Sequence, residues 1–238
     1  MFITTKGVVL KSYPFKQKKI IIKVFTRDHG LLTFMTRKTK SQSLISQPLT
    51  VIEVTYKNPR NSSISYIKDV GVEDAYHNLL FNNKKLQIAI SLSEILQKCL
   101  KEPSSKIYDF IVTSFKWLDT TNDYYIGFES LFLVHFCAIS GISPTDNLIL
   151  KKSSVLQLDL QAGAFIQNDI ELKYETLAPH KVSVEIYKLT SLNFEQLSEQ
   201  KMEEGLSKQI FEHLISYISI HLTDLSGLKS IRLLKELF

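Results

Sequence analysis

The sequence is poor in cysteine: only Cys99 and Cys137 occur among its 238 residues. Two distant cysteines cannot form a disulfide framework in a protein of this size, so we expect two buried thiols and a reducing compartment. Long hydrophobic runs are also missing, because the most apolar window, residues 128–142, is shorter than the ~20 residues of a spanning helix and contains His135. The N-terminal residues lack the apolar region of a signal peptide. These absences predict a cytosolic protein.

Motifs for nucleotide hydrolysis and metal chemistry are also absent. No glycine-rich loop ends in Gly-Lys-Ser/Thr, and residues 37–41 lack the glycines that let backbone amides surround a phosphate. The six histidines are scattered, and His213 and His221 lie two helical turns apart, too far for shared ligation. Residues 7–40 contain one acid, Asp28, whereas a nuclease needs paired carboxylates. The sequence therefore predicts neither a metal site nor catalysis.

Acidic residues are scarce in the first quarter of the chain. Residues 1–60 hold 12 Lys+Arg against 2 Asp+Glu, whereas the remainder holds 17 against 22. A field of one sign repels itself, so solubility alone does not explain it. The asymmetry predicts that the N-terminal part binds a polyanion.

Five short segments rich in Val, Ile, Thr, Phe and Tyr predict strands at 3–11, 19–26, 31–36, 49–57 and 63–72. Residues 27–30 form a compact hairpin connection in which Gly30 can take a positive φ. Residues 38–48 are rich in Ser, Lys and Gln and predict a loop. Five strands in about 70 residues favour a closed barrel of the OB type, which we assign to residues 1–75.

After Glu73 the apolar period becomes helical, which makes the fold class α+β. Helices are predicted around 88–99, after Ser104-Ser105, over 128–140 and over 203–222, with a short closing helix at 229–237. Between about 144 and 180 lies an irregular insert, with a small hairpin predicted over 155–166. Residues 76–238 are thus expected to form an α-helical bundle domain that carries the insert.

Basic residues at the predicted strand ends and loops are the candidate DNA-binding residues: Lys11, Lys16, Lys18, Lys19, Arg37, Lys38 and Lys40. Tyr13 and Phe15 are interleaved with them as candidate base-stacking rings. The alternative is that each lysine is merely solvated and that both rings fill the barrel. The sequence leaves the role of the two rings open.

Several segments resemble the RecO family of bacterial recombination mediators. They are GVVLKSYPF (7–15), VFTRDHGLL (24–32) with Arg37, FCAISGISP (136–144), LDLQAGAF (158–165), and YISIHL (217–222) with LKSIRLLKEL (228–237). The segments occur in order over almost the whole chain.

The resemblance implies an OB fold joined to a helical domain, without enzymatic turnover, in the nucleoid-associated fraction of the bacterial cytoplasm. Proteins of this family bind single- and double-stranded DNA, anneal complementary strands and, with RecR, help load RecA onto DNA coated by the single-stranded-DNA-binding protein SSB. By position, Arg37 and Lys40 match basic residues that follow the third strand in the family. Lys38 stands where many relatives have glycine.

The resemblance also bears on cofactors and protein partners. Many relatives carry a four-cysteine zinc site after the Gly-x-x-Pro turn, but the segment after Pro144 contains no cysteine. We therefore expect no cofactor, and an insert held by packing. The acidic, apolar tail of SSB would need an apolar pocket rimmed by basic side chains, for which Lys98 and Lys116 are the candidates.

Other classes of function stay open at this stage. An OB barrel with a basic face serves equally well as an RNA-binding or ribosome-associated module. A structural adaptor for an acidic protein would bind no nucleic acid at all. An enzymatic role would require metal-dependent cleavage that survives purification.

Overall fold

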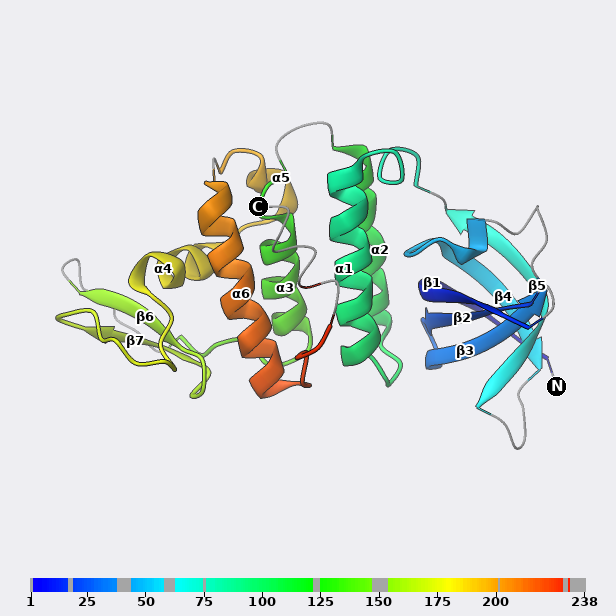
Figure 1. Ribbon diagram of the computed structural model, residues 1–238, viewed down its shortest axis with the longest axis horizontal. Coiled ribbons are helices and arrows are strands. Elements are labelled where there is room, and N and C mark those ends of the chain that lie inside the picture. The colour runs from blue at the N-terminus through cyan, green and yellow to red at the C-terminus, as the bar shows by residue number, and fades with distance from the viewer. Residues whose placement is uncertain are drawn as a thin grey trace. The chain divides into compact units, whose positions relative to one another are not determined.

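The computed structural model of the protein describes residues 2–16, 19–37, 44–57, 63–74, 76–121, 125–146, 154–200, 202–228 and 231. The chain forms two compact units, residues 1–120 with 228–234, and residues 121–227 with 235–238 (Figure 1). The predicted domain boundary at residue 75 separates the barrel from the helices, which is a different division from these two units. That boundary stays a prediction. Among the described residues, no helix has both the length and the apolar character needed to cross a membrane.

The first unit begins with a closed barrel of five strands, as predicted from the period-two pattern. The strands are β1 (Phe2–Phe15), β2 (Lys19–Thr26), β3 (Gly30–Arg37), β4 (Val51–Lys57) and β5 (Ile64–Asp74). They close in the order β1-β2-β3-β5-β4, with β3 and β5 parallel and the other pairs antiparallel. The α+β class and the OB-type barrel are therefore confirmed.

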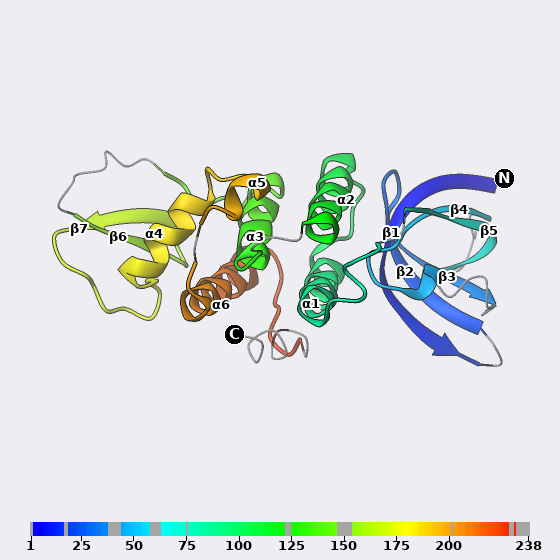
Figure 2. The ribbon, with the colours of Figure 1, turned by 90° about the horizontal axis from the view of Figure 1, so that it is seen from above.

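Strand β1 is unusually long and bends at an irregularity between Val9 and Lys11. A bulge of this kind lets one strand pair with two neighbours around a small barrel. Its first half pairs with β4 and its second half with β2. Figure 2 shows the middle of β1 next to α1 and α2, and both of its ends pointing away from these helices.

The inward-facing side chains of the barrel form one apolar core. Phe34 and Tyr56 meet edge to face, with ring centroids 5.0 Å apart. The buried members of this core are Val9, Ile20, Ile22, Val24, Phe34, Ile45, Ile52, Val54 and Tyr56. Because side chains alternate along a strand, the residues between them face away from this core. Some of these, such as Val8 and Phe25, are buried as well, whereas Tyr13, Phe15 and Tyr66 are exposed.

Helices α1 (Asn83–Cys99) and α2 (Ser105–Thr120) complete the first unit. Ser104 caps α2, since its Oγ accepts a hydrogen bond from the backbone N of Ile107 at 3.3 Å. The turn between the helices meets the barrel at Gly30, which has a φ of 71°. A Cβ at Gly30 would lie 2.3 Å from the carbonyl oxygen of Lys101. The predicted positive φ is confirmed, and the close approach adds a second reason for glycine.

The segment from the barrel to α1 is held by one buried carboxylate. Asp119, near the end of α2, accepts hydrogen bonds from the backbone N of His77, Asn78 and Leu79 at 3.1, 2.8 and 2.6 Å. A carboxylate that accepts three amide hydrogens fixes a turn that has no ladder partner. This contact ties α2 to the chain that leaves β5.

The second unit contains α3 (Phe128–Ile139), α4 (His180–Leu189), α5 (Phe194–Leu197) and α6 (Glu204–His221). Helix α3 is buried on nearly all sides, as predicted, and the chain turns at Gly141 with a φ of 76°. Helices α3 and α6 agree with the predicted ranges, but α4 and α5 were not predicted. The predicted closing helix at 229–237 lies outside the described residues except for Ile231.

Within the insert, β6 (Val155–Asp159) and β7 (Ala164–Asn168) form the predicted hairpin. Gln157 is 1% exposed and clasps the following segment: its Oε1 accepts from Leu172 N at 2.8 Å, and its Nε2 donates to Leu172 O at 2.9 Å. The hairpin is joined to α4 by Ser183, whose Oγ accepts from Leu158 N at 2.9 Å. Hydrogen bonds and apolar packing thus hold the described part of the insert together.

One acid is buried in the core of the second unit. Glu129 of α3 has no solvent exposure, and its Oε1 accepts a hydrogen bond from Ser207 Oγ of α6 at 2.7 Å. Its Oε2 has no hydrogen-bond partner among the described residues. Burial raises the pKa of Glu129 from 4.5 to about 7, because the low-dielectric core disfavours the charged form.

This acid predicts a pH dependence of stability. Since the folded state holds the Glu129 proton more tightly than the unfolded chain, the free energy of unfolding should fall as pH rises from about 4.5 to about 7 and then level off. The shift corresponds to about 3 kcal/mol at most. Glu129→Gln keeps an acceptor for Ser207 without the charge, so it should be more stable than the wild type at pH 8 and nearly equal at pH 5.

Urea unfolding at both pH values measures this difference. Glu195→Gln is the matched control, because Glu195 is exposed at the start of α5. If Glu129→Gln and the wild type lose stability in parallel between pH 5 and pH 8, the buried acid is not the cause.

Candidate nucleic-acid interface

The strand register places two parallel rows of side chains on the outer surface of the barrel. In the first, Tyr13 of β1 pairs with Ile21 of β2, Ile21 with Met35 of β3, and Met35 with Tyr66 of β5. Directly paired residues point to the same face of a sheet. We call Tyr13, Ile21, Met35 and Tyr66 the apolar row; Tyr13 and Tyr66 at its two ends are exposed, whereas Ile21 and Met35 between them are buried, at 4% and 7% exposed.

The second row lies two residues away from the first on each strand, in the direction of the C-terminal end of β1 and the N-terminal end of β2. Phe15 pairs with Lys19, and Lys19 pairs with Arg37. Lys68 follows Tyr66 by two residues on β5 and is exposed. We call Lys19, Arg37 and Lys68 the basic row. Because residues two apart on a strand lie about 7 Å from each other, cations and apolar side chains run side by side.

Tyr13 and Phe15 do not fill the barrel. Their side chains are 38% and 41% exposed, on the outer surface at the end of β1. The interpretation of these rings as core residues is therefore wrong. Their use for base stacking stays a prediction.

Two further rings, which the sequence analysis did not single out, lie on the same surface. Tyr66 is 63% exposed, and the Nζ of Lys19 lies 6.0 Å from its ring centroid. Phe2 is 52% exposed, and the Nζ of Lys68 lies 4.3 Å from its ring centroid. A cation near the face of a ring is attracted to it and holds both side chains in place. In the sequence, Tyr66 and Lys68 alternate with apolar Ile67, and this alternation is the signal that could have identified Tyr66 as a surface ring.

Four other cations of the first unit are paired with acids. Arg27 binds Asp109 of α2 through two hydrogen bonds, Nε to Oδ1 at 3.2 Å and Nη2 to Oδ2 at 3.0 Å. The bond to Asp109 raises the pKa of Arg27, which keeps the guanidinium charged. The remaining pairs are Lys6 with Glu73, Lys11 with Glu94 at 3.6 Å, and Lys116 with Asp74 at 3.1 Å. These acids lie on α1, on α2 and at the end of β5.

The candidate residues from the sequence thus divide into groups. Lys19 and Arg37 lie in the basic row, and exposed Lys16 follows β1. Lys11 is paired with Glu94 of α1 and lies apart from the basic row along β1. Lys18, Lys38 and Lys40 lie outside the described residues. Within the described part of the chain, neither Lys16 nor Arg37 forms an ion pair.

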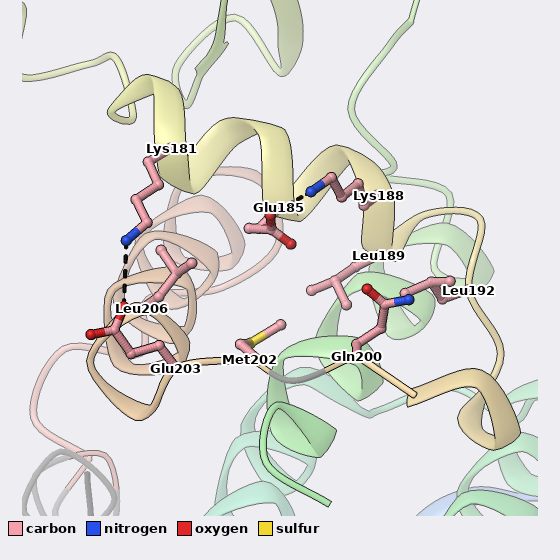
Figure 3. Close-up of a pocket in the computed structure, with 9 residues that line it drawn as sticks. All are labelled: Lys181, Glu185, Lys188, Leu189, Leu192, Gln200, Met202, Glu203 and Leu206. Atoms are coloured by element: carbon pink, nitrogen blue, oxygen red, sulfur yellow. Dashed lines mark hydrogen bonds and ion pairs between the residues drawn. The ribbon is translucent and has the colours of Figure 1, made fainter. Parts of the chain in front are cut away.

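The two candidates for tail binding lie on different helices, and their use for tail binding stays a prediction. Lys98 is exposed on α1, and Lys116 of α2 is bound to Asp74. The second unit instead contains an open pocket of about 260 Å³ beside α4 and the start of α6 (Figure 3). Leu189, Leu192, Met202 and Leu206 contribute apolar surface, while Lys188 and Lys181 contact Glu185 at 2.7 Å and Glu203 at 3.5 Å. Equal numbers of lysines and glutamates give this lining no net charge.

The described residues hold no group of three or more His, Cys, Asp or Glu placed to bind a metal ion. Burial raises the pKa of the Cys99 thiol to about 12, which makes it a poor nucleophile. Cys137 is buried, as predicted, whereas Cys99 is half-buried.

The geometry defines an OB-type barrel protein with a basic, partly aromatic outer face, and comparison with known proteins shows which proteins the chain is similar to. Residues 1–76 match the family model described as "Recombination protein O N terminal". "DNA repair protein RecO" of Azobacteroides pseudotrichonymphae is 25% identical over 251 residues, and that of Flavobacterium johnsoniae is 26% identical over 249, each match covering both chains completely. The protein of the same name from Flavobacterium psychrophilum is 24% identical over 246 residues, again over both full lengths. The chain is thus similar along its whole length to proteins named "DNA repair protein RecO", and its first 76 residues match the model of that family's N-terminal part.

The basic row itself predicts an effect on stability. Arg37 and Lys19 are like charges directly opposite each other on paired strands, which destabilises a sheet. Arg37→Gln should therefore raise the free energy of unfolding in low salt by about 0.5 kcal/mol, which shifts the urea midpoint slightly upwards. The gain should shrink in 0.5 M salt, because the charges are screened.

Lys106→Gln is the matched control, because Lys106 is exposed on α2 outside the barrel. An equal gain for both variants would attribute the effect to net charge, and a loss of stability in Arg37→Gln would contradict the predicted repulsion.

Proposed function

We propose that the protein is a non-enzymatic recombination mediator that binds single- and double-stranded DNA through its barrel and anneals complementary strands. The observation that carries this proposal is the basic row on β2, β3 and β5, which lies next to exposed rings. Among the residues that the structure describes, Arg37 forms no ion pair with a carboxylate. The face formed by strands 2 and 3 is the surface that OB barrels use for oligonucleotides. Similarity to proteins named for DNA repair makes DNA the preferred polyanion.

Annealing follows from electrostatics without nucleotide hydrolysis. A row of cations neutralises phosphates, screens the repulsion between two strands and raises their local concentration. We further propose that the protein acts with RecR to load RecA onto SSB-coated DNA, in the bacterial cytoplasm at the nucleoid and without a zinc ion or other cofactor. The family supports these partners, and the lack of cysteines after Pro144 supports a metal-free insert.

Salt dependence tests the electrostatic part. If about six phosphates are engaged, the log-log slope of single-strand affinity against salt should be near −4. Neutralising Lys19 and Arg37 together to glutamine removes about two of these contacts, so the slope should become shallower by about 1.4. Fluorescence anisotropy with a labelled oligonucleotide measures both slopes.

The control for this experiment is Lys101→Gln with Lys106→Gln, which removes the same charge from exposed positions outside the barrel. A flat slope in the wild type, or the same change of slope in the control, would refute DNA binding by the basic row.

Charge reversal at Arg37 and Lys40 together separates the functions of the chain. Arg37→Glu with Lys40→Glu should abolish annealing, because two repulsive charges replace two attractive ones. Binding of the acidic, apolar SSB tail should persist if the tail binds at Lys98, at Lys116 or in the pocket beside α4, whose lining has no net charge. Loss of both activities would contradict a division of labour between the barrel and the helices.

An OB-fold RNA-binding or ribosome-associated module is the second candidate, because rings and lysines on a barrel bind RNA equally well. Competition between single-stranded DNA, duplex DNA and structured RNA distinguishes the two. A clear preference for RNA without strand annealing would favour the RNA-binding module. No shift with any nucleic acid at low salt would favour an adaptor for an acidic protein.

A further inference from the structure

Exposed aromatic side chains are concentrated on the outer surface of the barrel. Tyr66, Phe2, Phe15 and Tyr13 are exposed by 63, 52, 41 and 38%. A single exposed ring needs no explanation, but four on one small barrel leave a large apolar area in water. They come from only two strands, the two ends of β1 and the start of β5.

Tyr66 is the ring that the register places within the site. It pairs with Met35 of β3, so it stands beside the strand that ends at Arg37. Lys19 reaches over it from β2, which places the side chains of two different strands at one ring. Tyr66 thus joins the apolar row to the basic row.

Phe2 continues the same pattern around the barrel. It pairs with Lys57 at the end of β4, and Lys68 of β5 lies over its ring. In both cases a lysine from one strand lies over an exposed ring from another. The two pairs therefore repeat one arrangement, with a cation and a flat apolar surface side by side.

This arrangement matches the two chemical parts of an unpaired strand. Phosphates need cations, and bases that are not paired need a surface on which to stack. A strand whose phosphates follow the basic row would place its bases near the exposed ring of Tyr66, which lies about 7 Å from Lys68 along β5. In a duplex the base faces are already stacked on their neighbours and cannot reach the rings, so only the phosphates would be read.

We propose that Tyr66 and Phe2 stack unpaired bases, so that the barrel surface prefers single-stranded DNA to duplex. This inference rests on the proposed DNA binding and adds the state of the strand that the site selects. The basic row supplies affinity for both forms of DNA. The two rings add affinity for the single strand alone, and this makes the single strand bind more tightly than the duplex.

The test compares the wild type and one double variant, each with three forms of DNA. Tyr66→Leu with Phe2→Leu keeps apolar side chains and removes the flat rings, while leaving every charge in place. Binding is measured by anisotropy with an oligonucleotide, with the same oligonucleotide carrying abasic sites at alternate positions, and with a duplex of equal length. Stacking contributes about 1–3 kcal/mol per base, so the variant should bind the intact single strand at least 10-fold more weakly.

The other measurements make the result specific. Duplex affinity and the salt slope of the variant should equal those of the wild type. The abasic strand should bind the wild type at least 10-fold more weakly than the intact strand, and the variant should no longer distinguish the two. Because the abasic comparison uses the unaltered protein, it is independent of any effect of the substitutions on folding.

Phe81→Leu is the matched control, since Phe81 is 88% exposed before α1 and lies outside the barrel strands. Unchanged single-strand binding in Tyr66→Leu with Phe2→Leu, or an equal loss on single strand and duplex, would overturn stacking while DNA binding by the basic row stands. If the wild type binds no DNA even at low salt, both the proposed function and this inference fail.

Discussion

The placement of acidic residues decides how this barrel can be used. Asp109 lies on α2, Glu94 on α1, and Glu73 and Asp74 at the end of β5. Together they pair with four cations of the first unit, namely Arg27, Lys11, Lys6 and Lys116. Exposed ion pairs of this kind stabilise a protein by little, about 0–1 kcal/mol each. Their larger consequence is electrostatic, because they cancel charge at these positions and leave the basic row uncompensated.

The β1 strand makes this division possible. Its irregularity between Val9 and Lys11 bends the strand, so that its middle lies next to α1 and α2 while its ends lie away from them. Lys11 follows the bend and meets Glu94 of α1. Phe2 and Phe15 are at the two ends and remain exposed. A straight strand could not pair with both β2 and β4 and also present its two ends to solvent.

Much of the fold was predictable because its signals are local. The five strands follow from alternation, and α3 follows from an apolar segment that ends at Gly141. Helix α4 was missed because Val182, Val184 and Ile186 alternate with polar residues, a pattern typical of a strand. Its buried residues Val182, Ser183, Ile186 and Leu189 show that tertiary packing selected the helical period instead. The alternation was misleading because α4 buries the polar Ser183, which accepts a hydrogen bond from Leu158 of the insert.

The candidate site was predictable only in part, because its geometry depends on pairing between distant strands. Charge counting found Lys19 and Arg37, since both lie in the basic first 60 residues. It could not find Tyr66 and Lys68, which join the site through the parallel pairing of β3 with β5. Nor could it show that Lys11 and Lys116 are neutralised, because the acids concerned are far away in the sequence. Strand register, rather than composition, therefore determines which cations can act together.

Electrostatic contacts and stacking contacts would contribute differently to annealing. Cations attract every form of DNA, and their contribution falls with salt, so they bring strands together without distinguishing paired from unpaired bases. Rings that bind only unpaired bases lose their contacts as base pairs form. A surface that uses both would hold a single strand more tightly than the duplex it becomes. Such a surface releases its product, because pairing removes the bases from Tyr66 and Phe2 while the basic row retains only the weaker, salt-sensitive contact.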